Sequence, residues 1–100
     1  MHYGGYVYIL CNKNRNVLYT GVSSDLRKRI YEHKHHHYST AFTSKYNCTT
    51  LVYYCSFERI EMAIKEEKRI KSGSRQQKID LINAMNPDWE DLWVTVQNWD

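Results

Sequence analysis

Two short segments rich in β-branched and aromatic residues constrain the fold of this chain most strongly. The segments are residues 6–11 (YVYILC) and 17–22 (VLYTGV), and residues 12–16 (NKNRN) separate them. β-branched and aromatic side chains favour extended backbone, whereas asparagine favours turns. We therefore expect the two segments to pair as an antiparallel hairpin, with Tyr8 and Tyr19 on neighbouring strands.

A helix, a loop and a third strand are expected to follow the hairpin. Apolar residues four positions apart begin directly after Asp25, a residue type that caps helix N-termini, and they predict a helix over 26–34. Residues 35–47 are polar and show no clear period, so they predict a surface loop. Residues 50–57 (TLVYYCSF) are again rich in β-branched and aromatic side chains, which predicts a third strand.

The second half of the chain is expected to be helical. Apolar residues return at helical spacing within 58–71, Gly73 supplies a C-terminal signal, and a further helix is expected over 75–84. Beyond Pro87, large apolar residues continue at helical spacing: Trp89, Leu92, Trp93 and Val96. They predict a tail that docks on the core as one aromatic stripe.

These elements predict an α+β fold class, with a three-stranded antiparallel sheet flanked by helices. One hundred residues leave room for one hydrophobic core, so we expect a single domain over 1–100, with a motif core at about 6–84 and a tail over 85–100. No apolar run approaches the about 20 residues that cross a bilayer, and the N-terminus lacks the order of a signal peptide. We expect a cytoplasmic protein without a membrane partner, and its three cysteines lack metal or disulfide spacing.

The basic residues are concentrated in one part of the chain. All fourteen Lys and Arg lie between Lys13 and Lys78 together with six acids, whereas five acids and no basic residue follow from Asp80 on. A basic face attracts polyanions, because each neutralised phosphate releases counterions. Nucleic acid is therefore an expected partner, and the alternative is a solvated surface whose charges are sorted by chance.

Glu67 is the charged residue that helical spacing places closest to a buried face. It lies four residues after Ala63 and three before Ile70, on or beside the apolar stripe of its helix. A carboxylate close to a buried face is unfavourable unless it pairs with a cation or binds a metal. Glu67 is thus a candidate metal ligand, and the alternative is a stripe-edge glutamate that turns to water or pairs with Lys71.

Arg29 and His33 are four residues apart and share one face of the first expected helix, beside its apolar stripe. The forked donors of Arg can hold a phosphate, and a His near neutral pH can shuttle a proton. Taken alone, the pair is explained more simply as a solvated cation and a histidine favoured by the helix dipole. Residues 35–37 (HHH) do not converge on one ion as a helical pair does, so we expect them on the loop surface.

Whether the tyrosines of the hairpin have a chemical role depends on charged groups near them. Tyr6 and Tyr8 share one strand face, and tyrosines on a hairpin usually pack with a wet hydroxyl. A phenol becomes a base only where a nearby cation or metal-bound water lowers its pKa from about 10. In this sequence, Arg29 and a metal ion bound to Glu67 are the charges that can lower the pKa of such a phenol.

The order of these residues resembles the GIY-YIG nuclease domain family, in particular small stand-alone bacterial members similar to the nuclease subunit of excision repair. The matching features are, in order, a Tyr-Val-Tyr triplet at 6–8, a Tyr-Thr-Gly triplet at 19–21, Arg29, His33 and a helical Glu67. Five positions in this order are far more specific than either triplet alone. Two departures are Tyr6, where the family name has glycine, and Thr20, where isoleucine is usual.

The resemblance implies an endonuclease that hydrolyses DNA phosphodiester bonds with one divalent cation, Mg²⁺ or Mn²⁺, on branched or damaged DNA. In the roles that it implies, Glu67 binds the metal and Tyr19 activates the attacking water. Tyr8 orients water or phosphate, Arg29 stabilises charge on the phosphoryl oxygens, and His33 supports the nucleophile side.

Further residues are expected to contact DNA on charge and stacking grounds alone: Arg27, Lys28, Lys45 and Tyr46. Some family members use a downstream asparagine, for which Asn83 and Asn86 are the candidates, neither of them assigned. A chain of this length has no separate recognition domain, so a specificity-conferring protein partner or the shape of the substrate must select the site of cleavage.

Two functions from other classes stay open. One is a nucleic-acid-binding module that keeps the fold and the basic face without turnover, and the other is an interaction protein whose tryptophan-rich tail packs on a partner. The nuclease is favoured because a protein that has lost catalysis would more often have lost one of the residues that the resemblance assigns.

Overall fold

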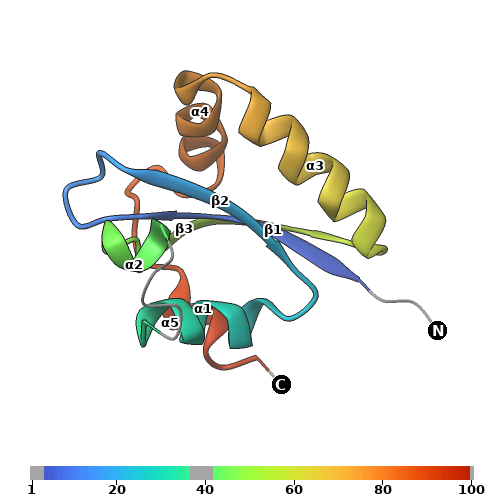
Figure 1. The fold of residues 1–100 in the computed structure, drawn as a ribbon, viewed down its shortest axis with the longest axis horizontal. Coiled ribbons are helices and arrows are strands. Elements are labelled where there is room, and N and C mark those ends of the chain that lie inside the picture. The colour runs from blue at the N-terminus through green and yellow to red at the C-terminus, as the bar shows by residue number, and fades with distance from the viewer. Residues whose placement is uncertain (1–3, 37–41, 100) are drawn as a thin grey trace.

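The computed structural model describes residues 4–36 and 42–99 and contains a sheet with helices on both faces (Figure 1). The elements are, in chain order, β1 (Gly5–Cys11), β2 (Leu18–Ser23), α1 (Leu26–Lys34), α2 (Phe42–Lys45), β3 (Thr50–Phe57), α3 (Ile60–Ser72), α4 (Arg75–Met85) and α5 (Trp93–Val96). In Figure 1, α3 and α4 lie on one side of the sheet, and α1 and α5 lie on the other. The expected α+β class with a three-stranded antiparallel sheet is confirmed.

β1 is the central strand of the sheet. The strand order is β2-β1-β3, and both neighbours run antiparallel to β1. Alternate residues of β1 enter two separate cores: Val7 and Ile9 face α3 and α4, whereas Tyr8 and Leu10 face α1 and α5. Because both faces of β1 are covered, its sequence is apolar or aromatic throughout instead of alternating with polar residues.

The helix that follows the hairpin begins as its sequence indicates. The Asp25 carboxylate accepts a hydrogen bond from the Lys28 amide at 3.1 Å and caps the N-terminus of α1. Leu26 and Ile30, one helical turn apart, are buried against the sheet. Arg27, Lys28 and Arg29 of the same turn are not part of this core.

The segment expected as a surface loop contains a short helix. α2 occupies Phe42–Lys45 and buries Thr43, whose carbonyl accepts a hydrogen bond from the Cys48 amide at 2.8 Å. His35 and His36 are exposed, as expected, and residues 37–41 lie outside the described residues. The prediction of a loop over 35–47 is therefore wrong in part. Thr43 is buried in contact with His33, which lies ten residues earlier, and the spacing of residues within 35–47 does not reveal this contact.

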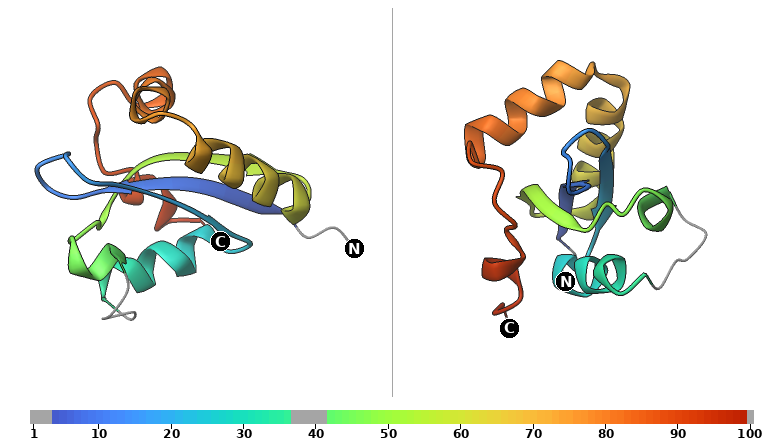
Figure 2. Two further views of the ribbon diagram at one scale, coloured as in Figure 1. Left: turned by 45° about the horizontal axis from the view of Figure 1, so that its top comes forward. Right: turned by 90° about the vertical axis from the view of Figure 1, so that its left-hand side faces the viewer.

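The C-terminal tail does not form the single aromatic stripe that its spacing predicts. Trp89 has a left-handed backbone conformation (φ 54°), which interrupts the helical spacing before α5 begins. Trp89 packs on the core beneath α3 and α4, whereas Leu92 and Trp93 pack on the core beside α1. Between them the chain passes the edge of β3, where the Leu92 amide donates to the Leu51 carbonyl at 2.8 Å. Figure 2 shows this passage from one face of the sheet to the other.

Cys11, Cys48 and Cys55 are free thiols. Cys11 and Cys48 are buried, and burial raises the pKa of the Cys11 thiol to about 11. Such thiols behave as small apolar side chains. Among residues 4–36 and 42–99, no helix has the length and apolar character that a bilayer-spanning segment requires.

Asn86 joins the end of α4 to the sheet and to the tail, and its removal should destabilise the fold. Its buried amide nitrogen donates to the carbonyls of Val52 at 3.1 Å and Glu90 at 2.8 Å. We expect Asn86→Ala to lower the free energy of unfolding by about 2 kcal/mol, because a buried carbonyl loses its donor. Urea denaturation followed by circular dichroism measures this change. Asn98→Ala, which alters an exposed asparagine, should change the value by less than about 0.5 kcal/mol; equal effects of the two variants would contradict this prediction.

Candidate active site

The two tyrosine triplets meet where Tyr8 lies opposite a glycine. In the antiparallel register, Tyr8 of β1 pairs with Gly21 of β2, and Leu10 pairs with Tyr19. A Cβ atom at Gly21 would collide with the ring and hydroxyl of Tyr8. The glycine of the second triplet is therefore the residue that makes room for the central tyrosine of the first.

Tyr8 begins a chain of hydrogen bonds that runs into α1 and α2. The Tyr8 hydroxyl lies 3.0 Å from Nε2 of His33, and Nδ1 of His33 lies 3.0 Å from Oγ1 of Thr43. All three residues are buried. Burial raises the pKa of the Tyr8 phenol well above its usual value, and nearby Tyr19 adds to this, whereas Arg29 acts in the opposite direction.

His33 is held in its neutral form by its surroundings. Burial and then the Arg29 guanidinium lower the pKa of His33 from 6.5 to about 4, and Glu32 opposes this. The neutral His33 ring has one donor and one acceptor nitrogen, so the Tyr8 phenol and the Thr43 hydroxyl take complementary roles at Nε2 and Nδ1.

Tyr19 is more accessible than Tyr8 and lies at the centre of an aromatic group. Its ring centroid is 6.4 Å from that of Tyr8 and 5.8 Å from that of His33. On another side it stacks on Phe42 of α2 at 6.1 Å. The ammonium of Lys71 lies 5.8 Å from the ring centroid, within the range of a cation–π contact.

Glu67 lies near Tyr8 and comes from α3, which packs on the face of the sheet opposite to α1. It projects from α3, which contacts both β1 and β2, and its side chain is 14% exposed. Oε2 of Glu67 lies 3.2 Å from the Lys71 ammonium, so the pairing that the sequence left open is present. Glu67 also lies close enough to Tyr8 for its charge to contribute to the raised phenol pKa.

Arg29 completes the group from α1. Its side chain is 38% exposed, and its Nε lies 3.7 Å from Oε1 of Glu32 one turn later. Its positive charge acts on both Tyr8 and His33. The structure thus brings five of the expected residues to one edge of the sheet, from β1, β2, α1 and α3: Tyr8, Tyr19, Arg29, His33 and Glu67.

The expected DNA-contacting residues divide into two groups. Tyr46 is exposed, stacks on Phe42 with a centroid distance of 4.6 Å, and lies 5.4 Å from the Lys45 ammonium. Because Phe42 also stacks on Tyr19, an aromatic path leads from the cluster to the surface of α2. Arg27 and Lys28 lie elsewhere on α1, and Nε of Arg27 donates to the Gln97 carbonyl at 3.1 Å.

The downstream asparagines have structural partners. Nε1 of Trp89 donates to Oδ1 of Asn83 at 2.7 Å, and the Asn86 side chain binds the backbone of β3, the strand at the edge opposite β2. Both therefore lie away from the cluster of five residues. Phe42 and Thr43, in contrast, lie in contact with it and were missed from the sequence. The only local signal was an apolar phenylalanine within a polar segment.

The donor set of the cluster suits a hard divalent cation. Among residues 4–36 and 42–99, no group of three or more His, Cys, Asp or Glu side chains converges on one point. Within the cluster of five residues, Glu67 supplies one carboxylate, which fits Mg²⁺ because this ion keeps most of its waters and takes few protein ligands. The Lys71 ammonium, 3.2 Å from Oε2 of Glu67, occupies this carboxylate, so a cation that binds there competes with Lys71.

Comparison with known proteins agrees with this geometry. The GIY-YIG catalytic domain family matches residues 4–80. A UPF0213 protein of Staphylococcus saprophyticus is 37% identical over 78% of this chain and 93% of its own length, and one of Syntrophus aciditrophicus is 34% identical over 83% and 93%. The solution NMR structure of a UPF0213 protein from Bacillus halodurans superposes with a TM-score of 0.56 at 30% identity, covering 88% of this chain and 92% of that one.

These matches cover most of the chain, and the family match over 4–80 includes both tyrosine triplets, α1 and the part of α3 that carries Glu67. The chain therefore belongs to the GIY-YIG catalytic domain family, a nuclease-type domain, and within it to the small bacterial UPF0213 proteins.

Proposed function

We propose that this protein is a metal-dependent endonuclease that hydrolyses phosphodiester bonds of DNA, with branched or damaged DNA as its substrate. The observation that carries the proposal is the convergence of Tyr8, Tyr19, Arg29, His33 and Glu67 at the β2 edge of the sheet. They come from four different elements and include a carboxylate, a guanidinium and two phenols. A fold that needed these positions only for packing would have no need of a carboxylate, a guanidinium and two phenols together at an accessible edge.

Each residue has a chemical task in this proposal. Glu67 holds a divalent cation, Mg²⁺ or Mn²⁺, which supplies charge neutralisation at the phosphate. The forked guanidinium of Arg29 binds the phosphoryl oxygens, where negative charge increases in the transition state. Tyr19 takes a proton from the attacking water, a task that suits its partly open position in the group.

Tyr8 has a different task from Tyr19, because their surroundings differ. Its phenol stays protonated and donates to His33, so its oxygen remains available as an acceptor that orients the attacking water. Thr43 holds the His33 ring in the matching tautomer. The two tyrosines thus separate into a fixed positioning group and a proton acceptor.

The carboxylate of Glu67 provides the main test of catalysis. We expect Glu67→Gln to reduce metal-dependent cleavage of plasmid and branched DNA by at least about 100-fold, because the amide has no charge to hold the cation. Gel assays with Mg²⁺ or Mn²⁺, with EDTA as the blank, measure the rate. Glu66→Gln is the matched control, since Glu66 is bound by Arg69 through two hydrogen bonds and is not part of the cluster of five residues. Cleavage that is equally fast in Glu67→Gln and Glu66→Gln would show that the proposed site is wrong.

Lys71 competes with a cation for Glu67, and its removal should strengthen metal binding. The ammonium lies 3.2 Å from Oε2 of Glu67, so a divalent cation must displace it or share the carboxylate with it. We expect Lys71→Met to lower the dissociation constant for Mn²⁺ about fivefold, as measured by isothermal titration calorimetry. Lys68→Met, at an exposed position of the same helix, should leave it within about twofold. An unchanged or weaker affinity in Lys71→Met would mean that the cation binds elsewhere.

The neutral state of His33 predicts how stability depends on pH. Its pKa is about 4 in the folded protein, against 6.5 ordinarily, so between these values the unfolded chain binds a proton that the native protein does not. Stability therefore falls as the pH decreases from 6.5 toward 4, by up to about 3 kcal/mol from this residue.

Comparison of two variants isolates that contribution. We expect His33→Gln to be less stable than the wild type at pH 7 and to lose less stability on acidification, in urea denaturation at several pH values. His35→Gln, at an exposed position, should follow the wild type. If the wild type and His33→Gln show the same change between pH 6.5 and pH 4, His33 is not held neutral in the native protein.

Absence of cleavage on every substrate, combined with tight DNA binding, would favour the other candidate, a binding module. One feature of the structure supports that candidate, because the Lys71 ammonium already neutralises the carboxylate of Glu67. The calorimetric titration separates the two cases, since a binding module has no need of a cation at Glu67.

A further inference from the structure

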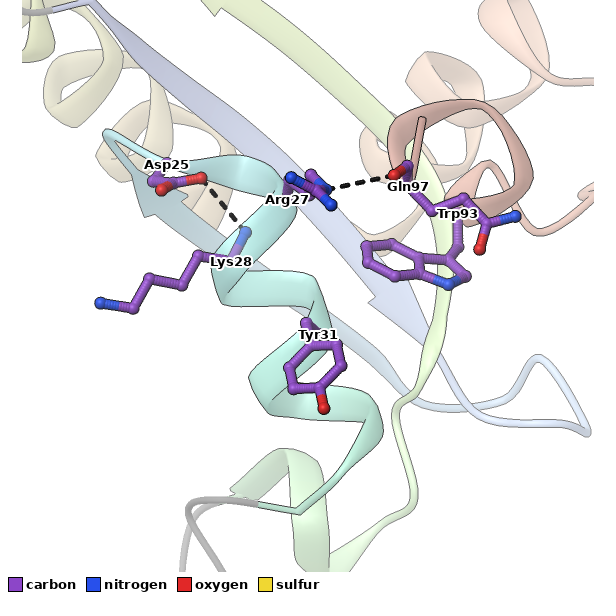
Figure 3. Close-up of a pocket in the computed structure, with 6 residues that line it drawn as sticks. All are labelled: Asp25, Arg27, Lys28, Tyr31, Trp93 and Gln97. Carbon is purple, nitrogen blue, oxygen red and sulfur yellow. Dashed lines mark hydrogen bonds between the residues drawn. The ribbon is translucent and has the colours of Figure 1, made fainter. Parts of the chain in front are cut away.

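A cavity opens between α1 and α5 (Figure 3). None of the residues that line it belongs to the proposed catalytic group, which is Tyr8, Tyr19, Arg29, His33 and Glu67. Its volume of about 420 Å³ lies in the range of small-ligand sites. The lining residues are Asp25, Arg27, Lys28, Tyr31, Trp93 and Gln97. The proposed chemistry at the β2 edge makes no use of this cavity.

The walls of the cavity combine aromatic rings with positive charge. Figure 3 shows Arg27 reaching from α1 toward Gln97, with the rings of Trp93 and Tyr31 below it. Nε of Arg27 donates to the Gln97 carbonyl at 3.1 Å, which fixes the guanidinium and leaves its terminal nitrogens to other acceptors. The carboxylate of Asp25 is engaged in capping α1 through the Lys28 amide at 3.1 Å.

This chemistry matches a nucleotide. A nucleobase stacks on aromatic side chains whatever its sequence, and an adjacent phosphate pairs with arginine and lysine. Tyr31 offers a ring that is 47% exposed, and its ring already stacks on the His35 ring with a centroid distance of 4.0 Å. The cavity therefore suits one base together with the phosphate beside it.

Three consecutive cations connect the cavity to the proposed catalytic group. Successive residues of an α-helix are about 100° apart around its axis. Arg29 faces Tyr8 and His33, Lys28 is exposed on the outer surface, and Arg27 lies over the cavity. The side of the first turn of α1 that faces away from the sheet thus carries positive charge, from the catalytic group to the cavity.

A DNA strand that follows these cations must curve around one helix. An α-helix with its side chains is about 10 Å across, whereas duplex DNA resists bending over about 150 base pairs. The bases of a duplex show only their edges in the grooves, so a base that enters the cavity and stacks on Tyr31 or Trp93 must be unpaired. The path therefore selects DNA that is single-stranded next to the scissile phosphate.

We propose that the cavity between α1 and α5 is a subsite for one nucleotide of a single-stranded segment that flanks the scissile phosphate. The subsite rests on the proposed nuclease function, because the strand leads from it to Arg29. It narrows the substrate class to DNA with an unpaired flank, such as a flap, a gap or a branch with a single-stranded arm.

Binding of an oligonucleotide tests the subsite without any cleavage. The probe is a fluorescein-labelled oligothymidine of about twelve nucleotides, followed by fluorescence anisotropy with the Glu67→Gln protein as background. We expect Tyr31→Leu and Lys28→Gln each to weaken its binding about fivefold to tenfold. The same changes should alter binding of a blunt duplex of equal length by less than about twofold. Lys65→Gln, at an exposed position of α3, is the charge-matched control.

A spectroscopic signal locates the base. Stacking on the indole should quench tryptophan fluorescence when unlabelled oligothymidine is added, and Trp93→Phe should remove most of that quenching. Trp89→Phe, which changes a tryptophan in the other core, should retain it. Anisotropy that Tyr31→Leu and Lys28→Gln leave unchanged, or that they weaken equally for duplex and single strand, would overturn the subsite.

The proposed function is judged separately by the Glu67→Gln cleavage assay. If the wild type cuts DNA while the cavity variants bind oligothymidine normally, the subsite is wrong and the nuclease proposal stands. If the cavity variants lose oligothymidine binding while no metal-dependent cleavage occurs, the single-strand site stands and the nuclease proposal is wrong.

Discussion

The close approach of the Tyr8 ring to Gly21 is the contact on which the candidate site depends. Because glycine has no side chain, a buried tyrosine on the central strand can lie across the neighbouring strand and extend its hydroxyl to His33 of α1. His33 in turn binds Thr43, so one hydrogen-bonded chain fixes the relative positions of β1, α1 and α2. A larger residue in place of Gly21 would disturb all three elements at once.

The position of the site at the β2 edge follows from the arrangement of two helices on opposite faces of the sheet. α1 packs on one face of the sheet and α3 on the other (Figure 1). Arg29 and His33 belong to α1, and Glu67 belongs to α3. At a sheet edge, side chains from both faces can meet, which they cannot do across the buried middle strand. The edge also leaves the group accessible, as the 38% exposure of the Arg29 side chain indicates.

The fold was largely predictable because its signals are local. The hairpin follows from two β-branched and aromatic segments around an asparagine-rich turn, and the start of α1 follows from the Asp25 cap. The predictions were wrong for α2 and for the tail. Thr43 is buried through contact with a residue ten positions away, and the left-handed Trp89 sends the tail past β3 to the opposite core. Helical spacing alone contains no information about such a change of face.

The sequence by itself determined the order of elements, the two tyrosine triplets and the residues that resemble a nuclease domain, because patterns of spacing and residue type express these features directly. Only the tertiary structure decided that Tyr8 and Tyr19 occupy different environments, that Glu67 lies against Lys71, and that Arg27 lies over a cavity apart from Arg29. The physical reason is that burial, tautomer and ion pairing depend on neighbours from other elements. In this chain those neighbours are brought together by packing on the two faces of one sheet.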